Sequence, residues 1–158
     1  MRIFGTVLAI ATLAGSLQAC SSSGGGAAAS KFIGTWHPSS GTVTTTCPGA
    51  GTDTSSVTTN LIWSMGVSSD LVQTDPSTSC VLNANITGST ASGTGAPCSF
   101  SDGSGGTATL TISSYTFALA ADGQTAQENG SGTFVDNNTG VTITCSLSET
   151  AAYQKISN

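Results

Sequence analysis

Apolar and polar side chains alternate along most of this chain, whereas no segment beyond residue 30 shows a helical period. Leu82, Ala84 and Ile86 alternate with asparagines, and the same pattern runs through residues 57–67 and 141–147. A period of two places the apolar side chains of a strand on one face. Threonine-rich strands joined by glycine-rich turns are typical of β proteins. The chain is therefore predicted to be all-β, an antiparallel meander of about eight strands.

One long strand changes its apolar phase between Ile112 and Tyr115. A single extra residue at Ser113–Ser114 would return both halves to the same face, which predicts a β-bulge in a bent strand. Asn129–Gly130 is interpreted as either a turn or a bulge inside a strand. Hairpin turns are predicted from glycine, aspartate, asparagine and proline residues at 66–70, 75–76, 88–90, 102–103, 122–123 and 136–140.

Two matching segments near the ends of the domain, 41–47 and 140–145, predict how the meander closes. Each alternates threonine with other residues and ends in a cysteine, Cys47 or Cys145. If the first and last strands pair, a disulfide between these cysteines would lock the seam of a closed up-and-down barrel. A β-sandwich is the alternative arrangement.

Cys80 and Cys98 then form the second disulfide. A three-residue loop at 88–90 would place them directly opposite each other in one hairpin. Four cysteines permit three pairings, so this choice depends on hairpin geometry. Disulfides imply an oxidising compartment, where each bridge contributes about 2–4 kcal/mol.

Residues 1–19 have the parts of an export signal: a positive start, an apolar stretch and small residues before Cys20. The ending Leu17-Gln18-Ala19-Cys20 resembles the lipobox of bacterial lipoprotein precursors. This resemblance implies cleavage before Cys20 and acylation of that residue, which would anchor the protein to a membrane. Ser21 follows in place of aspartate and favours the outer membrane of the cell envelope. The alternative is an ordinary secreted protein with an unmodified Cys20.

The remainder of the chain divides into two parts. Residues 20–30 are almost all serine, glycine and alanine, so they are predicted to form a flexible tether after the lipidated cysteine. Residues 31–158 are predicted to form a single β domain, because their length suits one hydrophobic core.

Phe32-Ile33-Gly34-Thr35-Trp36 resembles the Gly-x-Trp opening strand of lipocalins and avidins, the calycin-type barrels. The resemblance implies a lipocalin-like barrel in which Gly34 lets the chain pass closely at the closed end. It also implies that Trp36 plugs the floor and that a basic side chain of the last strand, here Lys155, covers the indole. The biotin-binding aromatic residues of avidins have no counterparts, so biotin binding is not expected. The whole chain is also similar to small Gram-negative lipoproteins with disulfide-bonded β domains.

Basic side chains are scarce in the domain. Once Arg2 is removed with the signal, two lysines oppose eight acidic residues, which gives a formal net charge of −6. Nucleic acid is excluded as a partner because phosphates could not be neutralised. A phosphate or carboxylate substrate would find no arginine to bind it.

Candidate catalytic and metal-binding residues are few, so the protein is predicted not to be an enzyme and to need no cofactor. The one histidine, His37, is expected at the surface where the first strand ends. A zinc site would lack ligands of suitable spacing. Asp102, Asp122 and Asp136 are explained by hairpin turns rather than by calcium.

Two functional hypotheses lead, and a third is weaker. The first is a monomeric interaction or inhibitor-like module that meets an envelope protein through its loops; small lipoproteins that inhibit lysozyme resemble it in outline. The alternative is a barrel that binds a small apolar ligand in its interior. A hydrolase built on two carboxyl groups is the third and least supported reading. The interior of the barrel is expected to be lined by Trp63, Met65, Tyr115, Phe117 and Phe134.

Overall fold

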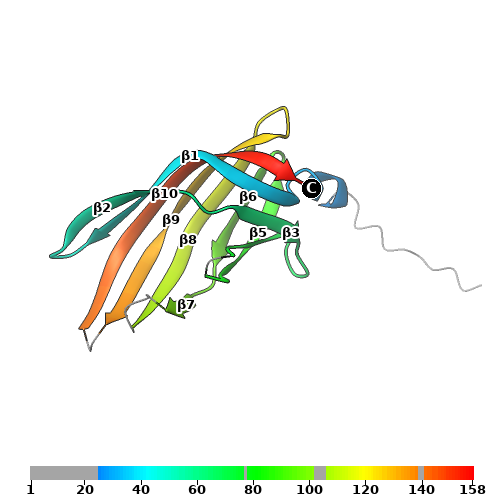
Figure 1. The fold of residues 1–158 in the computed structure, drawn as a ribbon. Helices are drawn as coiled ribbons and strands as arrows, with labels where there is room; N and C mark the ends of the chain where they lie inside the picture. Colours follow the sequence, from blue (N-terminus) through cyan, green and yellow to red (C-terminus); the bar gives the residue numbers. More distant parts are fainter. Residues whose placement is uncertain (1–24, 77, 102–105, 139–140) are drawn as a thin grey trace, which may run out of the picture.

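The computed structural model describes residues 25–158 except 77, 102–105 and 139–140. Within this part of the chain a five-residue helix is followed by ten β-strands (Figure 1). The elements are α1 Gly25–Ala29, β1 Gly34–Cys47, β2 Gly51–Ser56, β3 Leu61–Met65, β4 Leu71–Thr74, β5 Val81–Thr87, β6 Thr90–Gly95, β7 Cys98–Ser101, β8 Thr107–Leu119, β9 Thr125–Asn138 and β10 Val141–Ser157.

Eight of the strands form a closed, antiparallel, up-and-down barrel. The neighbours run β1, β3, β4, β5, β6, β8, β9 and β10, and pairing of β10 with β1 closes the sheet. The prediction of a closed barrel is therefore confirmed, and the sandwich alternative is not adopted. Every pairing is antiparallel because successive strands are joined by short connections.

The long strands β1, β8, β9 and β10 continue beyond the closed barrel (Figure 1). In this extension β2 pairs with β1 and the short β7 pairs with β8, so the curved sheet has an edge at each side. These two strands were not part of the predicted meander. The molecule thus has a closed end beside α1 and an open end formed by the extension.

The predicted bulge in β8 is present. The register with β9 shifts between Ile112 and Ser114, and Tyr115 and Ile112 then both line the barrel interior. Asn129–Gly130 proves to be neither a turn nor a bulge, because both residues lie within the regular ladder of β9 and β10.

Aromatic side chains fill the closed half of the barrel. Phe117 stands at the centre of this layer, with ring centroids 5.1 Å from Trp36, 5.6 Å from Trp63 and 5.8 Å from Tyr153. All four side chains are buried. Tilted and edge-on ring pairs at these separations contribute about 0.5–1.5 kcal/mol each beyond the burial of their area. This layer is the packed core, so any interior space must lie beyond it.

Two of the residues expected in the interior behave differently. Met65 ends β3 at the turn into β4 and is 54% exposed: it has the same phase as the buried Leu61 and Trp63, but it lies at the end of the strand, beyond the core. The expectation for Met65 is therefore wrong. Phe134 is partly buried and pairs with Phe100 of β7, at 6.4 Å between ring centroids, in the open extension.

The segment 25–29, expected to belong to a flexible tether, instead forms α1 and covers the closed end of the barrel (Figure 1). Ala29 and the following Phe32 are buried in the core, and the Phe32 amide donates a hydrogen bond to the Ala29 carbonyl. The small side chains permit this close approach. The predicted signal, Cys20 and the start of the tether lie outside the described residues. Among the residues that are described, no helix has the length and apolarity needed to cross a membrane.

Candidate functional site

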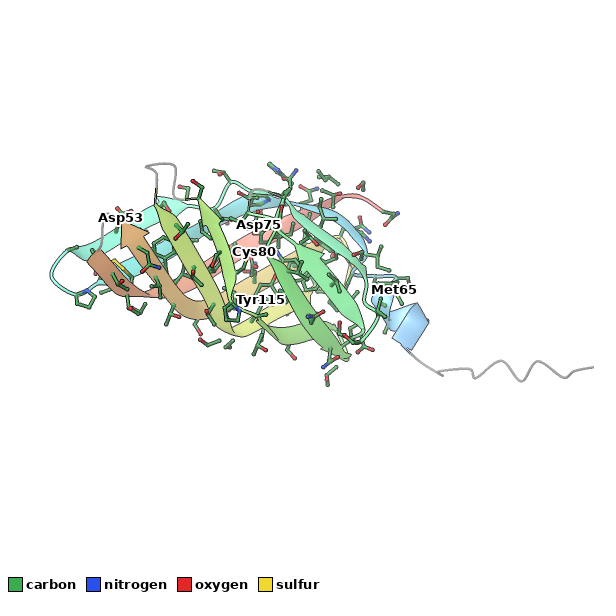
Figure 2. All side chains as sticks on the ribbon, turned by 90° about the horizontal axis from the view of Figure 1, so that it is seen from below. Asp53, Met65, Asp75, Cys80 and Tyr115 are labelled. Atoms are coloured by element: carbon green, nitrogen blue, oxygen red, sulfur yellow. A yellow bond between two sulfur atoms is a disulfide. The ribbon has the colours of Figure 1, made fainter. Side chains whose placement is uncertain are left out.

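A cavity of about 250 Å³ lies inside the barrel, between the aromatic layer and the open end. Three of its lining residues, Asp75, Cys80 and Tyr115, are labelled in the middle of the molecule in Figure 2. Apolar side chains supply most of the wall, and they come from six different strands or connections: Val43, Val57, Leu61, Leu82, Leu110, Ile112 and Leu147. The space therefore belongs to the barrel as a whole and not to a single loop.

Polar side chains gather where the cavity meets the aromatic layer. Glu128 of β9, Tyr115 of β8 and Tyr153 of β10 are 3%, 5% and 1% exposed. Glu128 points inward because it lies at the same phase of β9 as the buried Ala126. Within the described structure, Oε2 of Glu128 and both phenol oxygens make no hydrogen bond of acceptable geometry, although both phenols lie close enough to Glu128 to lower its pKa and so offset part of the effect of burial. Buried polar atoms without a partner are rare in folded proteins and cost about 1–3 kcal/mol each.

A second glutamate completes this polar group. Glu149 of β10 is partly buried in the cavity wall and neighbours Glu128 on the adjacent strand. Burial, together with the negative charges of Glu128 and Asp75, raises the pKa of Glu149 to about 8. Burial also raises the pKa of Glu128. The two side chains therefore hold at least one proton between them near neutral pH.

The phenols respond to the same environment. Burial raises the pKa of Tyr115 well above its usual value, and the charge of Glu128 adds to this effect. Burial and then Glu128 likewise raise the pKa of Tyr153. Both phenols stay protonated, so each offers one donor and one acceptor to the cavity.

Gly130 leaves open the space where two of these side chains approach each other. It pairs with Tyr115 on one side and with Glu149 on the other. A Cβ atom at this position would lie 3.8 Å from Tyr115 Cδ2 and 3.8 Å from Glu149 Cβ, which is ordinary contact. The backbone conformation at this position does not require glycine. The absence of a side chain therefore serves only to enlarge the cavity.

The basic side chains of the domain lie at the closed end, away from this carboxyl pair. Lys155 Nζ is 5.6 Å from the centre of the Trp36 ring and donates a hydrogen bond of 3.1 Å to the Lys31 carbonyl. Burial lowers the pKa of Lys155. The second lysine, Lys31, is exposed. Neither side chain compensates the charge of Glu128 and Glu149.

The three residues of the Gly-x-Trp resemblance meet at this closed end. Trp36 is buried, pairs in register with Lys155 and donates its indole N–H to the Phe32 carbonyl at 2.7 Å. Gly34 has a φ of 127°, and a Cβ there would collide with the Ser157 carbonyl oxygen. The three residues thus lie together at the floor of the barrel and take no part in the cavity.

The two disulfides border the cavity and the extension. Cys47–Cys145 joins β1 to β10, with a Cα–Cα distance of 4.2 Å, at the seam where the sequence placed it. Cys80–Cys98 joins the residue before β5 to β7. The predicted register of the β5–β6 hairpin was wrong by one residue. Thr87 pairs with Thr90, because the positive φ of Gly88 permits a turn of two residues.

The remaining candidates from the sequence do not join the site. His37 is exposed, but it lies within β1 and not at the end of the first strand, and its Nδ1 lies 2.9 Å from Asn60 Oδ1. Asp122 accepts hydrogen bonds from the amides of Gln124 and Thr125, which lowers its pKa and confirms a turn. Asp136 lies within β9, not in a turn, and Asp102 lies outside the described residues.

Sequence reasoning missed the carboxyl pair, although a signal was present. Glu128 and Glu149 are the two glutamates of the chain, and both stand at inward positions of alternating strands. No three acidic, histidine or cysteine side chains of the described residues come together in a way that could hold a metal ion. The chain matches no protein-family model, no curated protein and no solved structure.

Proposed function

We propose that this protein is a non-catalytic, lipid-anchored protein of the bacterial cell envelope whose barrel binds a small ligand with apolar and polar parts. The cavity is the observation that carries this proposal. Small eight-stranded barrels are filled by side chains unless they hold a ligand, and ligand sites combine apolar walls with a few placed polar groups. The cavity has both, and three of its oxygens, Oε2 of Glu128 and the hydroxyls of Tyr115 and Tyr153, make no hydrogen bond of acceptable geometry.

This proposal reverses the order of the two sequence hypotheses. A module that acts only through its loops has no use for space inside the barrel, and packing would be expected to fill it. The floor formed by Gly34, Trp36 and Lys155 supports a relationship to calycin-type barrels, in which the interior is the ligand site.

The test of ligand binding uses native mass spectrometry and a neutral fluorescent probe, N-phenylnaphthylamine. The full chain is exported to an oxidising periplasm and purified gently. We expect either a copurified small molecule or a saturable rise in probe fluorescence. Gly130→Val should narrow the cavity and weaken both signals, whereas Ser131→Val on the outer face of β9 should leave them unchanged. A bare mass with no probe binding in the wild type would contradict the proposal.

The proposed anchor has its own test. Lipidation at Cys20 adds acyl chains and places the protein in the membrane fraction. Cys20→Ser should release the protein into the soluble fraction without these chains. Equal distribution of the two proteins between the fractions would argue against the anchor.

One observation favours a second candidate, a protein-interaction module. All six residues of β2 are exposed, and the strand pairs only with β1 among the described residues, so its outer edge can accept a strand from a partner. A photo-crosslinking residue at Thr54 should then give a specific adduct in living cells. The same residue at Ser131, within the paired β9, serves as the control.

A further inference from the structure

The unpartnered atoms of the cavity identify the chemistry of its ligand. They are all oxygens: Oε2 of Glu128 and the hydroxyls of Tyr115 and Tyr153. Each accepts hydrogen bonds, and Glu149 stands beside them in the cavity wall. The phenols can also donate, but a carboxylate only accepts, so a ligand that presents several hydrogen-bond donors at one point suits this group.

The charge of the site points in the same direction. The carboxyl pair and the titratable side chains that face it come from β8, β9, β10 and the residue after β4. Three of these side chains are acids, Glu128, Glu149 and Asp75, and the other two are the phenols of Tyr115 and Tyr153. The two lysines of the domain lie at the closed end, beyond the aromatic layer. Two neighbouring carboxyls in a cavity without a protein cation are a site for a positive charge from outside.

We propose that the cavity binds an organic cation, a small molecule whose protonated amine sits at Glu128 and Glu149 and whose apolar body packs against the cavity wall. An ammonium group carries three N–H donors, which suits the three unpartnered oxygens. The ring of Tyr115 also belongs to the cavity wall, and an aromatic face is a favourable neighbour for a cation. Apolar residues such as Leu82, Leu110 and Ile112 would hold the body of the ligand.

Amine binding must compete with the proton that the carboxyl pair already holds. Below the pKa of Glu149 a proton neutralises one of the two charges, so the cation meets a weaker site. Above it both carboxylates are available, whereas an alkylamine, like a lysine side chain, stays protonated up to about pH 10. Affinity for the amine should therefore increase between neutral and mildly alkaline pH, and affinity for a neutral analogue should not.

This inference rests on the proposed function, and the experiment separates the two. Displacement of N-phenylnaphthylamine from the full-length, exported protein is measured with n-octylamine, n-octanol and octanoate. These probes share a chain length and differ in the charge of one end. At about pH 9 we expect octylamine to bind at least tenfold more tightly than octanol, and octanoate to bind most weakly. At about pH 5 the advantage of the amine over the alcohol should fall severalfold.

Two variants assign the effect to the pair. Glu149→Gln keeps the shape of the side chain, and it should reduce the pH dependence of octylamine binding, because only Glu128 of the pair still titrates. Asp53→Asn removes an exposed carboxyl of β2 far from the cavity and should change none of the three affinities (Figure 2).

Each result has a distinct meaning. If octanol binds as tightly as octylamine at about pH 9, the cation site is wrong, although the ligand-binding barrel stands. If octylamine binding keeps its pH dependence in Glu149→Gln, the pair is not the site of the amine. If neither the fluorescent probe nor any of the three compounds binds, the proposed function fails together with the inference.

Discussion

Glu149 should make the folded protein less stable as the pH rises. The unfolded chain ionises this residue near its ordinary pKa of 4.5, whereas burial beside Glu128 and Asp75 raises the pKa in the folded protein to about 8. Folding is therefore favoured fully below about pH 4.5, and this contribution is lost as the pH rises towards 8. A pKa unit corresponds to about 1.4 kcal/mol, so the upper limit of the loss is about 5 kcal/mol. Because Glu149 keeps some contact with solvent, we expect roughly half of that value.

The assay is urea unfolding of the wild type, Glu149→Gln and Asp53→Asn at about pH 5 and about pH 9. The wild type and Asp53→Asn should lose about 2–3 kcal/mol of unfolding free energy over this range, and Glu149→Gln should lose much less. The difference between the variants isolates Glu149 from the other carboxyls. Parallel losses in all three proteins would refute a raised pKa at this position.

Three further predictions concern the barrel itself. The Cys47–Cys145 disulfide closes a sequence separation of 98 residues, so replacing both cysteines by alanine should lower the unfolding free energy in urea by about 4–5 kcal/mol; a change below about 1 kcal/mol would contradict a locked seam. Phe117→Ala empties the centre of the aromatic layer and should cost about 3–5 kcal/mol in the same assay, while a small cost would mean that the layer collapses around the gap. Gly34→Ala forces a Cβ against the last strand at a φ of 127° and should lower the thermal midpoint, with a cost of at least about 1–3 kcal/mol; an unchanged midpoint would argue against the close approach.

Most of the barrel could be predicted from alternation and from the cysteines. The phase change at Ser113–Ser114 located the bulge of β8, because a strand that keeps one face inward must absorb an extra residue there. The two segments that end in Cys47 and Cys145 located the seam in the same way. The hairpin of β5 and β6 was misjudged by one residue because the sequence does not distinguish a two-residue turn at Gly88 from a longer one.

The cavity could not be predicted by the same reasoning, and its carboxyl pair was overlooked. Alternation identifies the face of a strand that points inward, but it does not say whether opposite walls meet. Gly130 and Gly95 keep part of the interior open. A glycine has no side chain, so its place in the sequence pattern does not show whether it faces the interior or the solvent. Pattern analysis also assigns glutamates to the solvent face, so Glu128 and Glu149 went unnoticed. The helix α1 was missed because its packing depends on the barrel end that it covers.

The position of α1 gives the molecule a direction. The chain enters the barrel at its closed end, beside Met65, whereas the cavity lies on the other side of the aromatic layer (Figure 2). Four residues separate Cys20 from Gly25, a span of at most about 18 Å. If Cys20 is lipidated as proposed, the barrel stands on the bilayer by its floor and its mouth faces the water. Cargo would then arrive by diffusion through the aqueous phase, not by sideways transfer from the lipid beneath.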